Sequence, residues 1–225
     1  MVAFNADISA LILAPDESSF FKNLKYLEQV RGYTIISSVV DKGFGVVPSV
    51  TIVTNSEDSM NLMKDSLSPL PGEDLYFLSS GDSCNLYDLF LYGISQCTTC
   101  HTLVMLGDAP LIPDLVLQTL VDLGVKRDAT LLRDIKGEPY PFLGVYNTAA
   151  TKKALEKSKN IDFIDKLNRV LFISYRALQT IDPDLLSFFR VITPLDLRRM
   201  NFFLSGGHIG KRGKGHRHKA GKIHI

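Results

Sequence analysis

The sequence predicts an α/β fold of three layers, a mostly parallel sheet with helices on both faces. Two observations predict it. Short apolar runs alternate with longer amphipathic stretches from the start of the chain, as in proteins built from strand–helix–strand units. The run at 8–14 is also continuously apolar, as expected for a strand that is covered on both faces.

The individual elements follow in order. We expect the first four strands at 8–14, 50–53, 75–78 and 102–106. Helices are expected at 33–40, from the candidate cap Ser56 to Leu67, at 85–96, and from Pro113 in a first helical turn to a stop at Gly124. Beyond residue 129 we expect strands at 129–132, 142–146 and 170–174, and helices at 148–158, 163–168 and 194–201.

Composition and charge divide the chain into a body, 1–205, and a tail, 206–225. The segment from His208 to Ile225 holds six Lys/Arg, no Asp/Glu and four of the five histidines, which leaves the rest of the chain with a net charge of −5. The absence of a run of about 18 apolar residues predicts no membrane span. Three cysteines without an export signal predict a cytoplasmic protein.

The tail has three possible interpretations. Its six cations suit nucleic acid or a nucleotide phosphate. Alternatively, His216 and His218 bind a metal together with His208 or His224, because imidazole suits Zn, Ni and Cu. The third interpretation is a solvated, disordered segment, since the tail has too few apolar residues and too many glycines to fold alone.

Polar residues follow the predicted strands at the edge where ligands bind in open α/β sheets. They are the segment from Pro15 to Lys25, then Asn55, then Asp108. A carboxylate at the position of Asp108 suits Mg²⁺, which prefers oxygen ligands and bridges substrate phosphates. The alternative is that Asp108 caps a helix that starts near Ile112.

Several stretches in the same order resemble the MobA-like nucleotidyltransferases. LGDAPLI at 106–112 is similar to their LGDMPLL, PFLGVY at 141–146 to PLxGLY, and VITPLDL at 191–197 to VNTPEDL. Residues 8–25 and 32–55 resemble the family's first strand, phosphate loop and lysine, and its following helix and strand. The resemblance covers about residues 7–200 and implies a nucleotide-diphospho-sugar transferase-like, Rossmann-like sheet.

The resemblance also implies an activity, the transfer of a nucleoside monophosphate from an NTP to a phosphate- or hydroxyl-bearing acceptor with release of pyrophosphate. GTP and molybdenum cofactor biosynthesis are typical of the family. The resemblance assigns catalysis to Asp108 and Lys25, with Mg²⁺ as the cofactor and Asp108 as its ligand. It assigns nucleotide binding to a further set of residues: Ala14, Pro15, Ser18, Ser19, Lys22, Asn55 and Asp82.

The chain departs from the family in the phosphate loop. The pattern LAGGxSxRxGxxK reads LAPDESSFFKNLK at 13–25, so Pro15 and Asp16 replace glycines and Phe20 replaces an arginine. Because Phe20, Phe21, Leu24, Leu27 and Val30 fall at helical spacing, with Asp16 as a candidate N-cap, the loop is also compatible with the first turn of a helix.

A second departure is Ile192, which replaces the asparagine of the family's NTP stretch. Two hypotheses remain open beside nucleotidyl transfer. One is a catalytically inactive family member that serves as a nucleotide-binding or assembly module, and the other is nucleic-acid association through the tail.

Cys97, Cys100 and His101 match the C-x-x-C-H spacing of haem attachment. Haem attachment requires export, and a zinc site would require further ligands nearby. We therefore interpret this stretch as the turn at the end of a helix.

Overall fold

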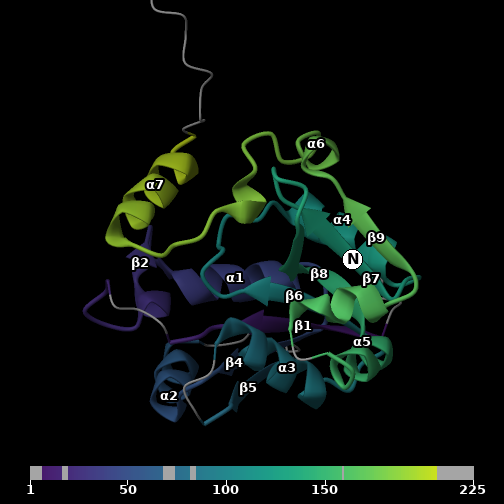
Figure 1. Cartoon of the computed structure of the whole chain (residues 1–225). Helices are drawn as coiled ribbons and strands as arrows, with labels where there is room; N and C mark the ends of the chain where they lie inside the picture. The colour runs from purple at the N-terminus through teal and green to yellow at the C-terminus, as the bar shows by residue number, and fades with distance from the viewer. Residues whose placement is uncertain (1–6, 17–19, 68–73, 82–84, 159, 207–225) are drawn as a thin grey trace, which may run out of the picture.

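A seven-stranded sheet lies at the centre of the molecule (Figure 1). The computed structural model describes residues 7–16, 20–67, 74–81, 85–158 and 160–206. The strand order is β5-β4-β1-β6-β8-β7-β9, and β8 runs antiparallel to both of its neighbours while the other pairs are parallel. The strands are β1 (Ile8–Leu13), β4 (Ser49–Thr54), β5 (Asp74–Ser79), β6 (His101–Leu106), β7 (Ala129–Arg133), β8 (Pro139–Asn147) and β9 (Val170–Ile173).

Helices connect these strands, and a two-stranded hairpin lies beside the sheet. The helices are α1 (Ile35–Phe44), α2 (Glu57–Ser66), α3 (Leu86–Gln96), α4 (Asp114–Gly124), α5 (Thr148–Leu155), α6 (Tyr175–Leu178) and α7 (Pro194–Leu204). The hairpin pairs β2 (Gln29–Val30) with β3 (Tyr33–Thr34). The 3₁₀ turns are η1 (Lys25–Leu27), η2 (Ile161–Lys166) and η3 (Leu186–Phe188).

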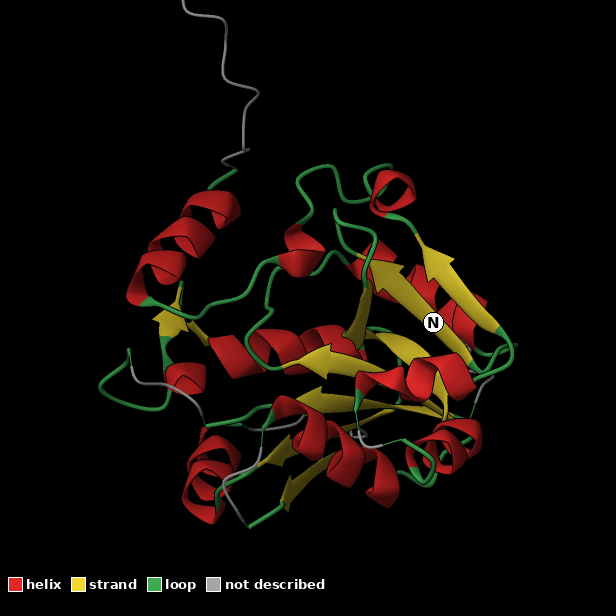
Figure 2. Cartoon of the chain, viewed as in Figure 1, coloured by secondary structure: helices red, strands yellow, loops and turns green. Residues whose placement is uncertain are grey.

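The helices cover both faces of the sheet (Figure 2). In β1, Ala10 lies against Gly43 of α1 and Leu11 lies against Gly93 of α3. Because neighbouring residues of a strand point to opposite faces, α1 and α3 are on opposite sides. This confirms the predicted three-layer, mostly parallel α/β architecture.

Helix boundaries follow local capping chemistry. Ser56 accepts a hydrogen bond from the Ser59 amide and starts α2, and Asn85 accepts from the amides of residues 87 and 88 at the start of α3. Pro113 occupies the N-cap of α4 rather than its first turn. Residues 161–166 form a 3₁₀ turn where an α-helix was expected at 163–168.

The spacing of apolar residues at 20–30 is compatible with a helix, but the prediction of a helix there is wrong. Of the described residues there, only Lys25–Leu27 are helical, as the short η1 turn, and Gln29–Val30 form β2. Leu24, Lys25 and Tyr26 are buried in succession. One face of a helix cannot bury three consecutive side chains, so an irregular backbone is required.

Among the described residues, no helix is both long and apolar enough to cross a membrane. The tail interpretations concern residues from 207 onward, which lie outside the described part of the chain. The division into a body and a tail therefore stays a prediction.

A close helix–strand contact provides a test of the packing. A Cβ added at Gly124, the last residue of α4, would meet the Val145 side chain of β8 at 2.4 Å. We expect Gly124→Ala to lower the free energy of unfolding by about 1–3 kcal/mol through overpacking. Val145→Gly removes the opposing Cβ together with both methyl groups, so in a denaturant-melt cycle the double variant should be more stable than the two single losses predict. Simple additivity would contradict this contact.

Candidate functional site

Asp108 lies just beyond the carboxyl end of β6, where its side chain is 1% exposed. It accepts three charge-assisted hydrogen bonds. Lys25 Nζ donates to Oδ2 at 2.7 Å, and Arg190 donates from Nε to Oδ1 at 2.9 Å and from Nη2 to Oδ2 at 2.8 Å. One carboxylate therefore faces two cations, and this group of three, which we call the Asp108 cluster, has a net charge of +1.

Lys25 reaches Asp108 because the turn that carries it packs against Gly107, which follows β6 directly. Gly107 leaves room for Tyr26, whose ring lies 3.1 Å from the place where a Cβ of Gly107 would stand. The Tyr26 hydroxyl donates to the Pro15 carbonyl at 2.9 Å, which ties this turn to the segment after β1. The Lys25 ammonium also lies 5.0 Å from the centre of the Tyr26 ring.

Arg190 is the residue of this cluster that the sequence analysis missed. It comes from the segment between η3 and α7, 82 residues away from Asp108. The next amide, that of the fully buried Val191, donates to the Asp108 carbonyl at 2.8 Å and fixes the two segments together. The available signal was one arginine within an apolar run at 188–192.

The contact between Asp108 and Arg190 shifts the pKa values of both groups. Burial raises the pKa of Asp108, but hydrogen bonds and charge from Arg190 and Lys25 outweigh it and hold that pKa below its ordinary value. Burial lowers the pKa of Arg190, while Asp108 more than compensates and raises it. Burial raises the pKa of the nearby Tyr140 to about 12, against the opposing charge of Arg190. Asp108, Arg190 and Tyr140 therefore each keep one protonation state near neutral pH.

The segment after β1 is tied to α2. The Asp16 amide donates to Asn55 Oδ1 at 2.8 Å, and the Asp16 carboxylate accepts from the Ser59 hydroxyl at 2.8 Å. Asp16 is thus directed to the first turn of α2, where a helix N-terminus favours negative charge. The described residues 20–24 form no helix that Asp16 could cap, in contrast to the N-cap role suggested by the sequence.

The structure brings together some of the predicted residues. Lys25 and Asp108 are in direct contact, and β1 lies between β4 and β6, so Pro15 and Asp16 separate Asn55 from Asp108. Ala14 and Pro15 are buried and Lys22 is exposed. Ser18, Ser19 and Asp82 lie outside the described residues.

Asp108 does not cap a helix. Helix α4 begins at Asp114, its N-cap residue is Pro113, and no side chain bonds to its first amides. Both oxygens of Asp108 instead accept from Lys25 and Arg190. The capping alternative is therefore wrong.

The cysteine stretch is the end of a helix. Cys97 is the C-cap residue of α3 and is buried, whereas Cys100 is exposed and His101 begins β6. Within the described part of the chain, no three His, Cys, Asp or Glu side chains gather as a metal site would need. The interpretation as a helix-end turn is confirmed.

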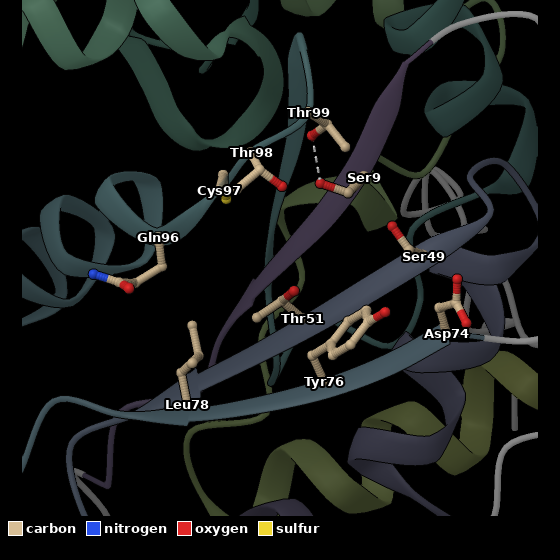
Figure 3. A pocket seen from close by; sticks show the side chains of 10 residues that line it. All are labelled: Ser9, Ser49, Thr51, Asp74, Tyr76, Leu78, Gln96, Cys97, Thr98 and Thr99. Carbon is tan, nitrogen blue, oxygen red and sulfur yellow. Dashed lines mark hydrogen bonds between the residues drawn. The ribbon is translucent and has the colours of Figure 1, made fainter.

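A separate cavity of about 360 Å³ opens at the other end of the sheet (Figure 3). Ser9, Ser49 and Asp74 line it from the amino ends of β1, β4 and β5, and the Ser9 and Thr99 hydroxyls are hydrogen-bonded at 2.8 Å. Because Asp108 follows the carboxyl end of β6, this cavity is distinct from the predicted site.

Comparison with protein families decides the family. A model of the MobA-like NTP transferase domain matches residues 10–171, which is most of the chain. The chain belongs to the MobA-like NTP transferase family. The resemblance inferred from 106–112 and its companion stretches is confirmed.

Individual relatives agree with this family. The chain is 23% identical over 203 residues to a probable molybdenum cofactor guanylyltransferase of Natranaerobius thermophilus, with 88% of this chain and 97% of the relative covered. Molybdopterin-guanine dinucleotide biosynthesis protein A from Archaeoglobus fulgidus is similar in structure, with a TM-score of 0.66 and 20% identity over 88% of this chain and 99% of that one.

A further solved structure has a similar fold. The 4-diphosphocytidyl-2C-methyl-D-erythritol synthase from Anaerococcus prevotii gives a TM-score of 0.65 at 15% identity, over 89% of this chain and 99% of that one. At these identities the solved structures establish the fold, which is the nucleotide-diphospho-sugar transferase-like fold predicted from the sequence.

The buried carboxylate makes the stability of the MobA-like chain depend on pH. Asp108→Asn leaves Lys25 and Arg190 without their anion, and we expect a loss of about 3–5 kcal/mol in the free energy of unfolding at neutral pH. The folded pKa of Asp108 is depressed below its unfolded value of about 3.9. The ionised carboxylate therefore contributes fully to the free energy of unfolding above the unfolded pKa. This contribution is lost as the pH falls through the folded pKa.

Urea melts between neutral pH and pH about 3 measure both effects. The parent should lose more stability on acidification than Asp108→Asn does. Asp114→Asn is the matched control, because the Asp114–Lys42 pair is exposed and should contribute less than about 1 kcal/mol. Equal losses for the two variants would contradict the assignment of Asp108 as the buried anion.

Proposed function

We propose that this MobA-like protein binds a nucleoside triphosphate beside the Asp108 cluster and transfers its nucleoside monophosphate to a phosphate- or hydroxyl-bearing acceptor. One observation carries the proposal: Lys25 and Arg190 converge on Asp108 at the carboxyl edge of the sheet. Ligands of open α/β sheets bind at this edge, and a net positive cluster there attracts the phosphates of a nucleotide.

The chemistry requires cations where charge develops. The acceptor oxygen forms a bond to the α-phosphorus as the bond from that phosphorus to the bridging oxygen breaks, and pyrophosphate leaves with the bonding electrons. Positioned cations stabilise the charge on the departing group. Arg190 bonds Asp108 through Nε and Nη2, and its remaining N–H groups are available to a phosphate. Its side chain is the more exposed of the two cations, at 26% against 5% for Lys25.

Magnesium stays a prediction. In the described arrangement Asp108 already accepts from two cations, so its charge is neutralised where a dication would need it. The residues present therefore fit a phosphate better than a metal ion. The proposed roles of Lys25 and Arg190 do not depend on the ion.

The relatives suggest the donor and the pathway. Because one relative is a probable molybdenum cofactor guanylyltransferase, GTP is the donor to test first, and a pterin phosphate is the acceptor class to test first. We place the protein in the cytoplasm, as the cysteine content predicts. Contacts of the tail with nucleic acid or metal stay predictions.

A second candidate function is nucleotide binding without transfer. Pro15 has no amide hydrogen to offer a phosphate, and Asp108 is saturated by its two cations. Both features favour a chain that holds a nucleotide but turns it over slowly. Pyrophosphate release separates this candidate from the first.

Replacement of Lys25 tests the proposed site. We expect the parent to bind GTP in a calorimetric titration and to release pyrophosphate when a phosphorylated pterin is supplied. Lys25→Gln removes one phosphate cation and should weaken binding by about tenfold or more, the worth of one charge-assisted hydrogen bond. Lys42→Gln is the matched control, since Lys42 pairs with Asp114 at the surface.

The outcomes are distinct. Binding with pyrophosphate release supports transfer, and binding without release across all four NTPs supports the second candidate. Absence of binding to any NTP, or unchanged affinity in Lys25→Gln, contradicts the proposed site.

A further inference from the structure

Arg190 contacts both oxygens of Asp108 with its guanidinium fork. The two hydrogen bonds, from Nε to Oδ1 and from Nη2 to Oδ2, measure 2.9 and 2.8 Å, and such paired bonds are the strong, directional form of the arginine–carboxylate contact. Lys25 Nζ completes the set at 2.7 Å. The negative charge of the buried Asp108 carboxylate is thus neutralised by two side chains of this protein, Lys25 and Arg190.

The position of Arg190 is fixed by its neighbours. Val191 is fully buried, and its amide donates to the backbone carbonyl of Asp108 at 2.8 Å. Val191 also belongs to a small core that includes Ile35 and Met200, which joins this segment to α1 and α7. The guanidinium is therefore held over the carboxylate by the packing and the backbone hydrogen bond of the next residue, Val191.

The same arrangement is unfavourable for a divalent cation. Mg²⁺ and Mn²⁺ require oxygen ligands with negative charge, and a dication beside Asp108 would lie next to Lys25 and Arg190. Ile192, two residues beyond Arg190, supplies no oxygen ligand from its side chain. Within the described residues, no group of three or more candidate metal ligands compensates for this.

We propose that Arg190 occupies, at Asp108, the place that a divalent cation would take, so that this protein binds its nucleotide without a metal ion. The part that concerns nucleotide rests on the proposed function. The part that concerns Asp108 does not, because it is a statement about which cation the carboxylate accepts.

The first experiment uses Mn²⁺ alone and no nucleotide. Thermal unfolding of the full chain is followed with and without millimolar Mn²⁺ for the parent, Arg190→Gln, Arg190→Lys and the control Arg169→Gln. Arg169 pairs with Asp128 at an exposed position away from the cluster, with its own side chain 71% exposed. We expect Mn²⁺ to raise the melting temperature of Arg190→Gln, whose Asp108 has lost a cation, and to leave the parent and both other variants unchanged.

Two results would overturn the proposal in this experiment. Stabilisation of the parent by Mn²⁺ to the same extent as Arg190→Gln would mean that a metal binds with Arg190 in place. Absence of any stabilisation of Arg190→Gln would mean that a dication cannot take the position that Arg190 leaves. Arg190→Lys keeps a positive charge there, so it separates the effect of charge from that of size.

The second experiment measures GTP affinity in excess EDTA and in excess Mg²⁺. The parent should bind equally in both conditions, within about twofold. Arg190→Gln should lose about tenfold in EDTA, the worth of one charge-assisted contact, and recover in Mg²⁺. A parent that loses tenfold or more in EDTA contradicts metal-independent binding. If no variant binds GTP in either condition, the proposed function fails, and the Mn²⁺ experiment still decides the role of Arg190.

Discussion

The burial of the Asp108 carboxylate is the constraint on which the edge of the sheet depends. An isolated charge in such a position is prohibitively costly, so the chain must deliver compensating cations. Lys25 comes from the turn after the first strand, and Arg190 from the segment before the last helix. Three segments far apart in sequence are thereby drawn to one point. The irregular backbone around Lys25 follows from this, because Lys25 and Tyr26 must both face inward.

Elements with local signals could be predicted from the sequence, and contacts between distant segments could not. The strands β1 and β6 consist mostly of apolar residues. Ser56 and Asn85 mark the starts of α2 and α3 through hydrogen bonds within a few residues. The helical spacing of Phe20 to Val30 gave a wrong prediction. The ion pair between Lys25 and Asp108 and the β2–β3 hairpin determine the backbone there instead of local periodicity. Asp108 was found through its place directly after the fourth predicted strand, and Lys25 through a family pattern. Arg190 follows no local rule, since only the folded chain brings it to the carboxylate.

The negative charge of Asp16 interacts with helix α2, although its position in the phosphate loop suggests that it would face the nucleotide. A carboxylate in a phosphate loop would repel a nucleotide if it faced the binding site. Asp16 instead accepts from Ser59 at the start of α2, where the helix dipole favours it, and its amide holds Asn55. The negative charge is therefore placed on α2, while the positive charges of Lys25 and Arg190 remain at the end of β6. The edge keeps its attraction for anions although two loop glycines are replaced.

Core and edge of this MobA-like protein are specified by different residues. Every residue of β1 is buried, and close contacts such as Gly93 against Leu11 set the separation of helix and strand. None of these contacts involves Lys25, Arg190 or Asp108. Substitutions at the edge can therefore alter which ions the site accepts while the packing of the sheet is preserved. This separation explains how a chain that shares about a fifth of its residues with its relatives keeps their fold.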